Sequence, residues 1–309
     1  MTQYTIVQEV TETILKLLDI VSTGEVEYWF PLSGLAYNPV SKHTYTSLNQ
    51  LLLSYALYKK DYSHNYWLTF KQIREAGGSV IKGEKATPIT FSEVIYLKDE
   101  TKIPLKQAQE LLQKARQEQS NITYRDIGIS LRRFLKYYWV FNVAQTQGLP
   151  GKLTCPDRLL LSHYELYEEI ERLITDLQVR IVHVSANSAH YDLWNDKIQM
   201  PFPQQFSNKE NYYATKFHEL VHWSGHPLRL NRPLGRSGSS EYAFEELVAE
   251  IGSALLCTYF SIPAPMTSTT AYVKSWLQAL ENDQMYILKA VKEAEKAMQF
   301  VTAKSTISV

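Results

Sequence analysis

Cysteine is scarce in this chain: only Cys155 and Cys257 occur among its 309 residues, and they stand far apart. Neither belongs to a CxxC pair, so the sequence contains no cysteine motif for a metal or redox centre. Two isolated thiols also exclude a disulfide-rich scaffold, and they are typical of a protein in a reducing compartment.

Long apolar segments and an excess of charge of one sign are also missing. No run approaches the roughly 20 apolar residues that a membrane-spanning helix needs. The first 20 residues include Glu9, Glu12 and Asp19 but not the basic segment that opens a signal peptide. The chain has 32 Lys+Arg and 32 Asp+Glu, so its overall field does not attract a polyanion. We therefore expect a cytoplasmic protein without a membrane partner.

The most informative motif that the chain does contain is HELVH, in which His218, Glu219 and His222 form an HExxH run. On a helix, positions i and i+4 lie one above the other, so both imidazoles would face the same point. Two neutral imidazoles suit Zn²⁺, and Glu219 can take a proton from a water activated by the metal. The motif predicts a zinc-dependent hydrolytic site, although the same donors also accept Mn²⁺ or Co²⁺.

The residues around the motif predict the helix that it requires. Residues 211–223 (NYYATKFHELVHW) place apolar side chains around the histidine pair. Ser207 is a plausible N-cap, and Gly225 with Pro227 would end the helix.

A catalytic zinc usually takes a third protein ligand, and nearby histidines do not supply it. In the extended pattern HExxHxxGxxH the third histidine would fall at position 228, which is Leu228. His226 follows His222 by four residues, and a straight helix cannot wrap three successive i+4 residues around one ion. We therefore expect His226 to be a helix-end or outer group.

The acidic run Glu241 to Glu250 (EYAFEELVAE), which opens a second helix, offers the third ligand. Glu245, Glu246 and Glu250 all lie at a suitable distance along the chain. We predict that Glu246 is the ligand and that Glu250, one turn later, receives a hydrogen bond from a ligand imidazole. Glu245 would then point about 100° away.

The first half of the chain has the pattern of an α+β domain. Helices are expected at 47–59, 70–76 and 103–120, strands at 88–97 and 137–143, and a polar excursion at 121–136. A Gly- and Pro-containing linker follows at 148–156.

The second half has the pattern of a small antiparallel sheet followed by two helices. A helix is expected at 158–177, and short strands at 179–184, 190–194 and 196–201 precede the HExxH helix. This is the layout of a zincin, in which an edge strand lies beside an extended peptide substrate. Lys197 to Met200 is the candidate edge strand.

Long stretches of the sequence resemble the ArdC-type antirestriction proteins of plasmids and other mobile elements. The stretches are NPVSKHTYTSLNQLLL (38–53), YWLTFKQIREAGGSVIKGEKATPI (66–89), YYWVFNVAQTQGLP (137–150), DKIQMP (196–201), YYATKFHELVHWSGHPLRLNRPLG (212–235) and YAFEELVAEIGSALLC (242–257). The resemblance implies an N-terminal domain that binds single-stranded DNA (1–150) and a C-terminal zincin-like metallopeptidase domain (151–309).

The composition of residues 38–98 is compatible with the DNA-binding role that the resemblance implies. Eight Lys/Arg stand against four acidic residues, with tyrosines and tryptophans interleaved. Cations can follow phosphates while ring faces take unstacked bases, although an aromatic core with solvated lysines would give the same composition. With the resemblance, we predict DNA contacts from six residues: Tyr45, Asn49, Trp67, Lys71, Lys82 and Lys85.

Two hypotheses for function follow. In the first, the protein protects incoming DNA from restriction and is also a zinc metallopeptidase acting on a protein or peptide, with Glu219 as base and Tyr242, His226 or Arg236 as a further oxyanion donor. In the second, it is a non-catalytic single-stranded-DNA-binding protein with a structural metal site. A structural zinc would be closed by four ligands and would not need Glu219, so the complete HExxH motif favours chemistry.

Overall fold

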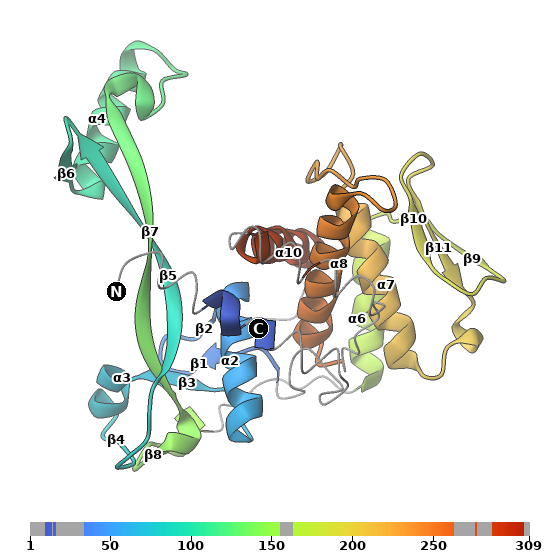
Figure 1. Cartoon of the computed structure of the whole chain (residues 1–309), viewed down its shortest axis with the longest axis horizontal. Coiled ribbons are helices and arrows are strands. Elements are labelled where there is room, and N and C mark those ends of the chain that lie inside the picture. Colours follow the sequence, from blue (N-terminus) through green and yellow to red (C-terminus); the bar gives the residue numbers. More distant parts are fainter. Residues whose placement is uncertain are drawn as a thin grey trace.

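The computed structural model describes residues 10–13, 15–16, 34–154, 163–262, 276 and 286–305 (Figure 1). Cys155, the start of the helix expected at 158–177 and most of the N-terminal 33 residues lie outside this set. No helix among the described residues has the length and apolar character to cross a membrane.

A long two-stranded ribbon dominates the first half of the chain. Strands β5 (Thr87–Lys98) and β7 (Ile129–Asn142) pair antiparallel from Thr87 opposite Val140 to Lys98 opposite Ile129. Figure 1 shows this ribbon reaching away from the other elements as an arm, with β6 (Thr101–Ile103) and α4 (Leu105–Glu118) at its far end. The polar excursion predicted at 121–136 is therefore wrong for 129–136, because the full length of β5 needs a partner strand for its backbone groups.

Shorter elements cover the near end of the ribbon. Strand β3 (Trp67–Thr69) extends the sheet to the order β3-β7-β5-β6. Helix α3 (Phe70–Glu75) begins at a capping box between Thr69 and Gln72 and ends before Gly77, whose positive φ of 84° suits glycine. Two small pairs complete this half: β1 (Tyr37–Asn38) with β2 (His43–Thr44), and β4 (Ser79–Val80) with β8 (Thr146–Gln147).

Helix α2 (Ser47–Lys60) joins the ribbon to the second half. The amide of Asn49 acts as a short substitute for a neighbouring strand: its Nδ2 donates to the Thr90 carbonyl at 2.8 Å and its Oδ1 accepts from the Thr90 N–H at 2.8 Å. On the α10 side, the backbone N–H of Ser47 donates to Glu295 Oε1 at 3.4 Å.

The second half contains a three-stranded sheet beside a layer of helices. Its strands are β9 (Ile181–Val184), β10 (His190–Asp192) and β11 (Lys197–Pro201), in the order β10-β11-β9. β10 and β11 pair antiparallel, whereas β11 and β9 pair parallel. The chain passes from β9 to the outer position of β10 and then returns as β11 between them. The predicted edge strand Lys197–Met200 is therefore central, and β10 is an edge.

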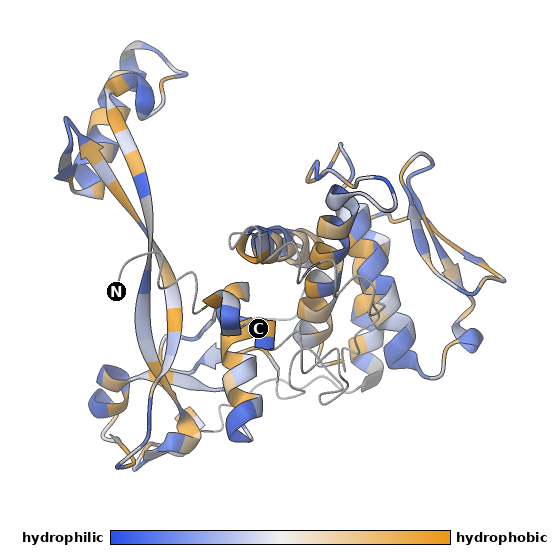
Figure 2. Ribbon diagram, viewed as in Figure 1, coloured by the Kyte–Doolittle hydropathy of each residue, from blue (hydrophilic) through white to orange (hydrophobic). Residues whose placement is uncertain are grey.

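The helices α6 (His163–Asp176), α7 (Lys209–Ser224), α8 (Ser240–Tyr259) and α10 (Tyr286–Thr302) enclose the main core. Helix α8 carries hydrophobic residues along its length (Figure 2). The N-cap of α7 is Asn208, whose Oδ1 accepts from the Asn211 N–H at 2.7 Å, and not the predicted Ser207. The helices α7 and α8 approach closely at Gly252, where an added Cβ would lie 2.8 Å from Val221 Cγ2.

We expect the substitution Asn49→Ala to lower the free energy of unfolding by about 1–3 kcal/mol, because it leaves the buried N–H and C=O of Thr90 without partners. Urea denaturation of the full chain measures this change. The matched exposed substitution Lys71→Ala should stay within about 0.5 kcal/mol of the parent. An Asn49→Ala protein as stable as the Lys71→Ala control would contradict the structural role of this amide.

Candidate metal centre

The two histidines of the HExxH run face each other from successive turns of α7. Their Nε2 atoms lie 3.1 Å apart, and the planes of the rings make an angle of 76°. Both side chains are largely buried. These two ring nitrogens point to one position, which a cation can occupy.

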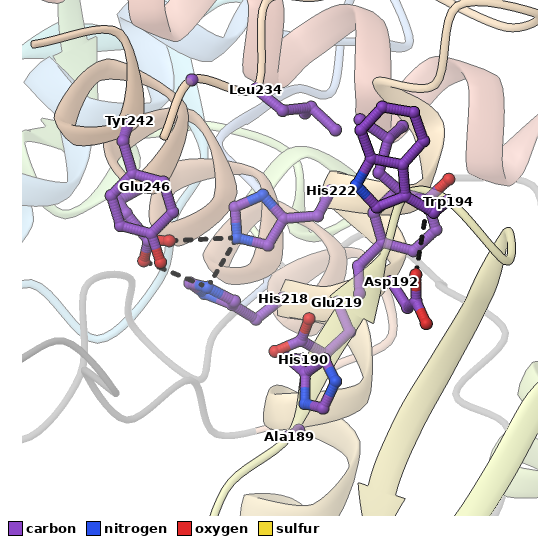
Figure 3. Close-up of a pocket in the computed structure, with 13 residues that line it drawn as sticks. Ala189, His190, Asp192, Trp194, His218, Glu219, His222, Leu234, Tyr242 and Glu246 are labelled. Carbon is purple, nitrogen blue, oxygen red and sulfur yellow. Dashed lines mark hydrogen bonds and ion pairs between the residues drawn. The ribbon is translucent and has the colours of Figure 1, made fainter. Parts of the chain in front are cut away.

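Glu246 brings a carboxylate from α8 to the same point. Its Oε2 lies 3.6 Å from His218 Nε2 and its Oε1 lies 3.5 Å from His222 Nε2 (Figure 3). A tetrahedral ion with ligands at about 2.0–2.1 Å holds its donor atoms about 3.3 Å apart. The donor atoms of His218, His222 and Glu246 all lie within 4.8 Å of one another, so this trio fits a divalent ion with small adjustments.

The other nitrogen of each imidazole meets a carboxylate of α8. His222 Nδ1 forms a hydrogen bond with Glu245 Oε1 at 3.2 Å, whereas His218 Nδ1 lies 3.5 Å from Glu250 Oε1 and has no hydrogen-bond partner among the described residues. The expectation that Glu245 points away is wrong, because the 100° between Glu245 and Glu246 places these two carboxylates on opposite sides of the His222 ring. Outer carboxylates of this kind fix the tautomer and orientation of ligand histidines.

Arg232 completes the support of His222 from the loop after α7. The guanidinium is 6% exposed and donates to Glu245 twice, from Nε at 2.9 Å and from Nη2 at 2.7 Å. Nη2 also donates to the Val221 carbonyl at 2.6 Å. Gly225 makes room for it, since an added Cβ would lie 2.9 Å from Arg232 Nη2. The sequence analysis predicted neither Arg232 nor the contact between Glu245 and His222. The only signal that could have led to Arg232 is the general requirement of a buried carboxylate for a cationic partner.

The charges of the centre favour a cation. Burial would lower the pKa of His222, but Glu245 and Glu246 outweigh it and raise the pKa to about 10. The pKa of His218 is raised in the same way, against burial, with Glu246 as the main partner. Burial would raise the pKa of Glu246, but the two imidazoles hold it below its ordinary value. The cage therefore stabilises positive charge, which a divalent ion can supply in place of protons.

Glu219 differs from the other carboxylates of this region. It is 6% exposed, and its Oε2 is buried with no hydrogen-bond partner among the described residues. It lines the cavity beside the histidines and is not one of the residues that converge on the metal position (Figure 3). A buried carboxylate oxygen left without a partner is costly, which is typical of a group reserved for water or substrate.

A cavity of about 490 Å³ opens beside the trio. Its lining includes residues 189–194, which span β10 and the turn after it, together with Leu234, Gly235 and Tyr242. Trp194, at its rim, is 93% exposed. Of the three candidate oxyanion donors only Tyr242 lines this cavity; His226 lies past the helix end, where its Nδ1 accepts from the Leu228 N–H at 3.1 Å.

The residues predicted to bind DNA divide into two groups. Trp67 is fully buried and its Nε1 donates to Asn65 at 2.7 Å, Asn49 holds Thr90, and the half-buried Tyr45 donates its hydroxyl to the Trp67 carbonyl at 3.0 Å. Trp67 and Asn49 are thus buried within the fold, whereas Tyr45 keeps part of its surface exposed, and DNA contact by any of the three stays a prediction. The other three, Lys71, Lys82 and Lys85, are exposed.

Comparison with known proteins gives two matching family models. One, described as the N-terminal domain of anti-restriction factor ArdC, matches residues 4–141. The other, described as a zincin-like metallopeptidase, matches residues 168–293.

Among curated proteins, the chain is 32% identical to a DNA primase TraC of Escherichia coli over 96% of its own length and 27% of the primase. A second Escherichia coli TraC primase is 30% identical, with 93% of this chain and 19% of the primase covered. The chain therefore spans about a fifth to a quarter of these primases. The uncharacterized protein y4eC of Sinorhizobium fredii is 29% identical, with 97% of this chain and 92% of y4eC covered.

Solved structures give a match over nearly the whole length of both chains. The metal-free crystal structure of the antirestriction protein ArdC from plasmid R388 has a TM-score of 0.72 and 30% identity, with 96% of each chain covered. Its Mn(II)-bound structure has a TM-score of 0.71 and 30% identity, with 96% of this chain and 97% of that chain covered. Identity and coverage together establish that this chain belongs to the ArdC family of antirestriction proteins.

Proposed function

We propose that this protein shields single-stranded DNA from restriction in the cytoplasm and that its second half is a metal-dependent peptidase. The proposed domains are residues 1–150 for DNA binding and 151–309 for the peptidase. Membership of the ArdC family supports the first role. The second rests on one observation: the trio His218, His222 and Glu246 stands beside an open cavity lined by Glu219, whose Oε2 has no hydrogen-bond partner among the described residues.

The proposed roles of the residues follow from their positions. His218, His222 and Glu246 hold the ion, while Glu245 and Glu250 orient the two imidazoles. A bound divalent ion would supply Lewis acidity for activating water and polarising a carbonyl. Glu219 takes the proton of the attacking water and returns it to the leaving amine.

A peptide suits this cavity better than a nucleic acid. The outer edge of β10 lies along one wall, and its unpaired backbone groups can pair with an extended peptide. The lining residues include Asp192, Glu219 and Glu246 but no lysine or arginine among the described residues. The lining therefore offers no lysine or arginine to pair with the successive phosphates of a nucleic acid strand, whereas a peptide backbone is uncharged and needs none.

Zinc is the ion that we propose for the site. Two imidazoles and one carboxylate are a common donor set for catalytic zinc, and they leave one position open. The same set also accepts Mn²⁺ or Co²⁺, and the R388 relative has a structure named as Mn(II)-bound.

A second candidate function is a DNA-binding protein in which the ion only stabilises the fold. The supporting observation is the buried network that ties Arg232 to Glu245 and Glu245 to His222, because an ion in its midst would fasten α7 to α8. Replacing Glu219 separates the two candidates, since a structural ion does not require it.

We expect Glu219→Gln to lower peptide cleavage about 10²–10⁴-fold, the usual contribution of a general base. Affinity for metal and for single-stranded DNA should not change, because Glu219 is not one of the ligands. Cleavage of a mixed peptide library by the metal-loaded full chain, followed by mass spectrometry, measures the effect.

The control for this substitution is Glu241→Gln, which changes an exposed carboxylate in the first turn of α8. It should cleave peptides like the parent. Equal cleavage by the Glu219→Gln and Glu241→Gln proteins would remove Glu219 from the chemistry. Full protection of DNA by a Glu219→Gln protein that no longer cleaves would show that peptidase activity is not part of antirestriction.

We expect Glu246→Ala to abolish tight metal binding and Glu245→Gln to weaken it about 10–100-fold, as loss of an outer hydrogen bond does. Titration calorimetry of chelator-treated protein with Zn²⁺ measures both. In the parent, a free ion concentration about 100 times the dissociation constant should stabilise the fold by about 2.7 kcal/mol. Parent-like affinity in Glu246→Ala, with loss in Glu245→Ala or Glu250→Ala, would move the third ligand to one of those residues.

A further inference from the structure

The arm formed by β5, β7 and α4 has a net positive charge, which the rest of the chain balances. Residues 87–142, which span β5 to β7, contain nine Lys/Arg and six Asp/Glu, a balance of +3, whereas the whole chain has a net charge of zero. Lys106 and Lys114 of α4 are exposed and form no ion pair with any residue that the structure describes. The arm is therefore an extended basic element that projects into solvent (Figure 1).

Two exposed aromatic rings stand together at the root of this arm. Phe91 is 60% exposed and Tyr138 is 47% exposed, and their ring centroids lie 5.9 Å apart at an interplanar angle of 81°. Phe91 lies opposite Lys136 in the ribbon, and Tyr138 is two residues further along, so all three share one face. Neither ring belongs to a hydrophobic cluster of the described core.

The exposed faces of these two rings are available to a ligand, because they do not pack into the protein core. An aromatic side chain with half of its surface in water gains little for the stability of the fold, but it offers a face on which an unstacked base can lie. In duplex DNA the base faces are already stacked on one another. The cations beyond the rings complement the phosphates of the same strand.

We propose that the arm is the binding surface for single-stranded DNA, with Phe91 and Tyr138 stacking against bases and the basic arm following the phosphates. This assignment rests on the proposed DNA-binding function. It places the stacking contacts on Phe91 and Tyr138 of the ribbon and not on Tyr45 and Trp67, whose side chains pack within the fold. Lys136 neutralises Glu93 on the same face, together with Lys102 at 3.5 Å, so no unpaired acid opposes the strand there.

The test compares two labelled strands of equal length and charge, an oligothymidylate of about 20 nucleotides and its abasic counterpart, by fluorescence anisotropy. The parent should prefer the strand with bases. Phe91→Ala with Tyr138→Ala should weaken binding of the oligothymidylate roughly 5- to 150-fold, the value of one or more stacking contacts, and leave the abasic strand unaffected. Lys106→Glu with Lys114→Glu should weaken both strands and reduce the salt dependence.

Two controls separate stacking from damage to the fold. Phe202→Ala removes an aromatic ring that is 44% exposed in the other half, and it should bind like the parent. Phe91→Leu with Tyr138→Leu keeps apolar area without a ring and should bind like the alanine pair at an unchanged melting temperature. Equal losses for thymidylate and abasic strands would overturn the stacking assignment.

The failures of the two proposals look different. If the parent binds the oligothymidylate and the alanine pair binds it equally well, the arm assignment is wrong and the DNA-binding function stands. If the parent binds neither strand, the DNA-binding function fails, and the arm assignment fails with it.

Discussion

The close packing of α8 against α7 fixes the position of every group in the metal centre. Gly252 permits this packing, because any side chain there would meet Val221, one residue before His222. With the two helices this close, successive residues of α8 reach both nitrogens of an imidazole: Glu246 lies at the inner one of His222 and Glu245 at the outer one. A wider helix spacing would leave room for water between rings and carboxylates, and the donor atoms would no longer converge.

That packing buries several charged side chains, and each of them requires a partner of opposite charge. Arg232 donates two hydrogen bonds to Glu245, and Glu245 and Glu246 together raise the pKa of His222 against the effect of burial. Buried ion pairs contribute little net stability because desolvation offsets their attraction. The network is better explained by what it positions: a cage that prefers a divalent ion to solvent and holds it in one geometry.

The sequence predicted most of the features that depend on local spacing within a helix or strand. It predicted far fewer of the features that depend on contacts between residues distant in the sequence. HExxH on a helix fixes the two imidazoles through the spacing of i and i+4, and the acidic run narrowed the third ligand to three glutamates. Arg232 lies in an irregular loop with no periodicity, so nothing local marked it. β7 is long because it pairs with the full length of β5. β11 is central because the chain leaves β9, forms β10 at the outer edge and returns between the two.

Composition could not distinguish core aromatics from displayed ones. Trp67 and Tyr45 both fit the pattern of aromatic residues among cations. Trp67 is nevertheless fully buried, and the Tyr45 hydroxyl donates a hydrogen bond to the backbone carbonyl of Trp67. Only the register of the ribbon, which places Phe91 and Tyr138 on a face beyond the cover of the helices, identifies the exposed rings.

Under the two proposals made above, the distribution of charge separates the surface for DNA from the cavity for a peptide. The arm has a net positive charge, the cavity is lined by no lysine or arginine among the described residues, and screening limits each field to about 8–10 Å at ordinary ionic strength. In these proposals a DNA strand on the arm leaves the cavity beside the metal centre unoccupied. Helix α2 contacts both parts, through Asn49 to β5 and through Ser47 to α10. Any mechanical influence of bound DNA on the metal centre has a continuous packed route through this helix, because α10 in turn packs against α8, which carries Glu246.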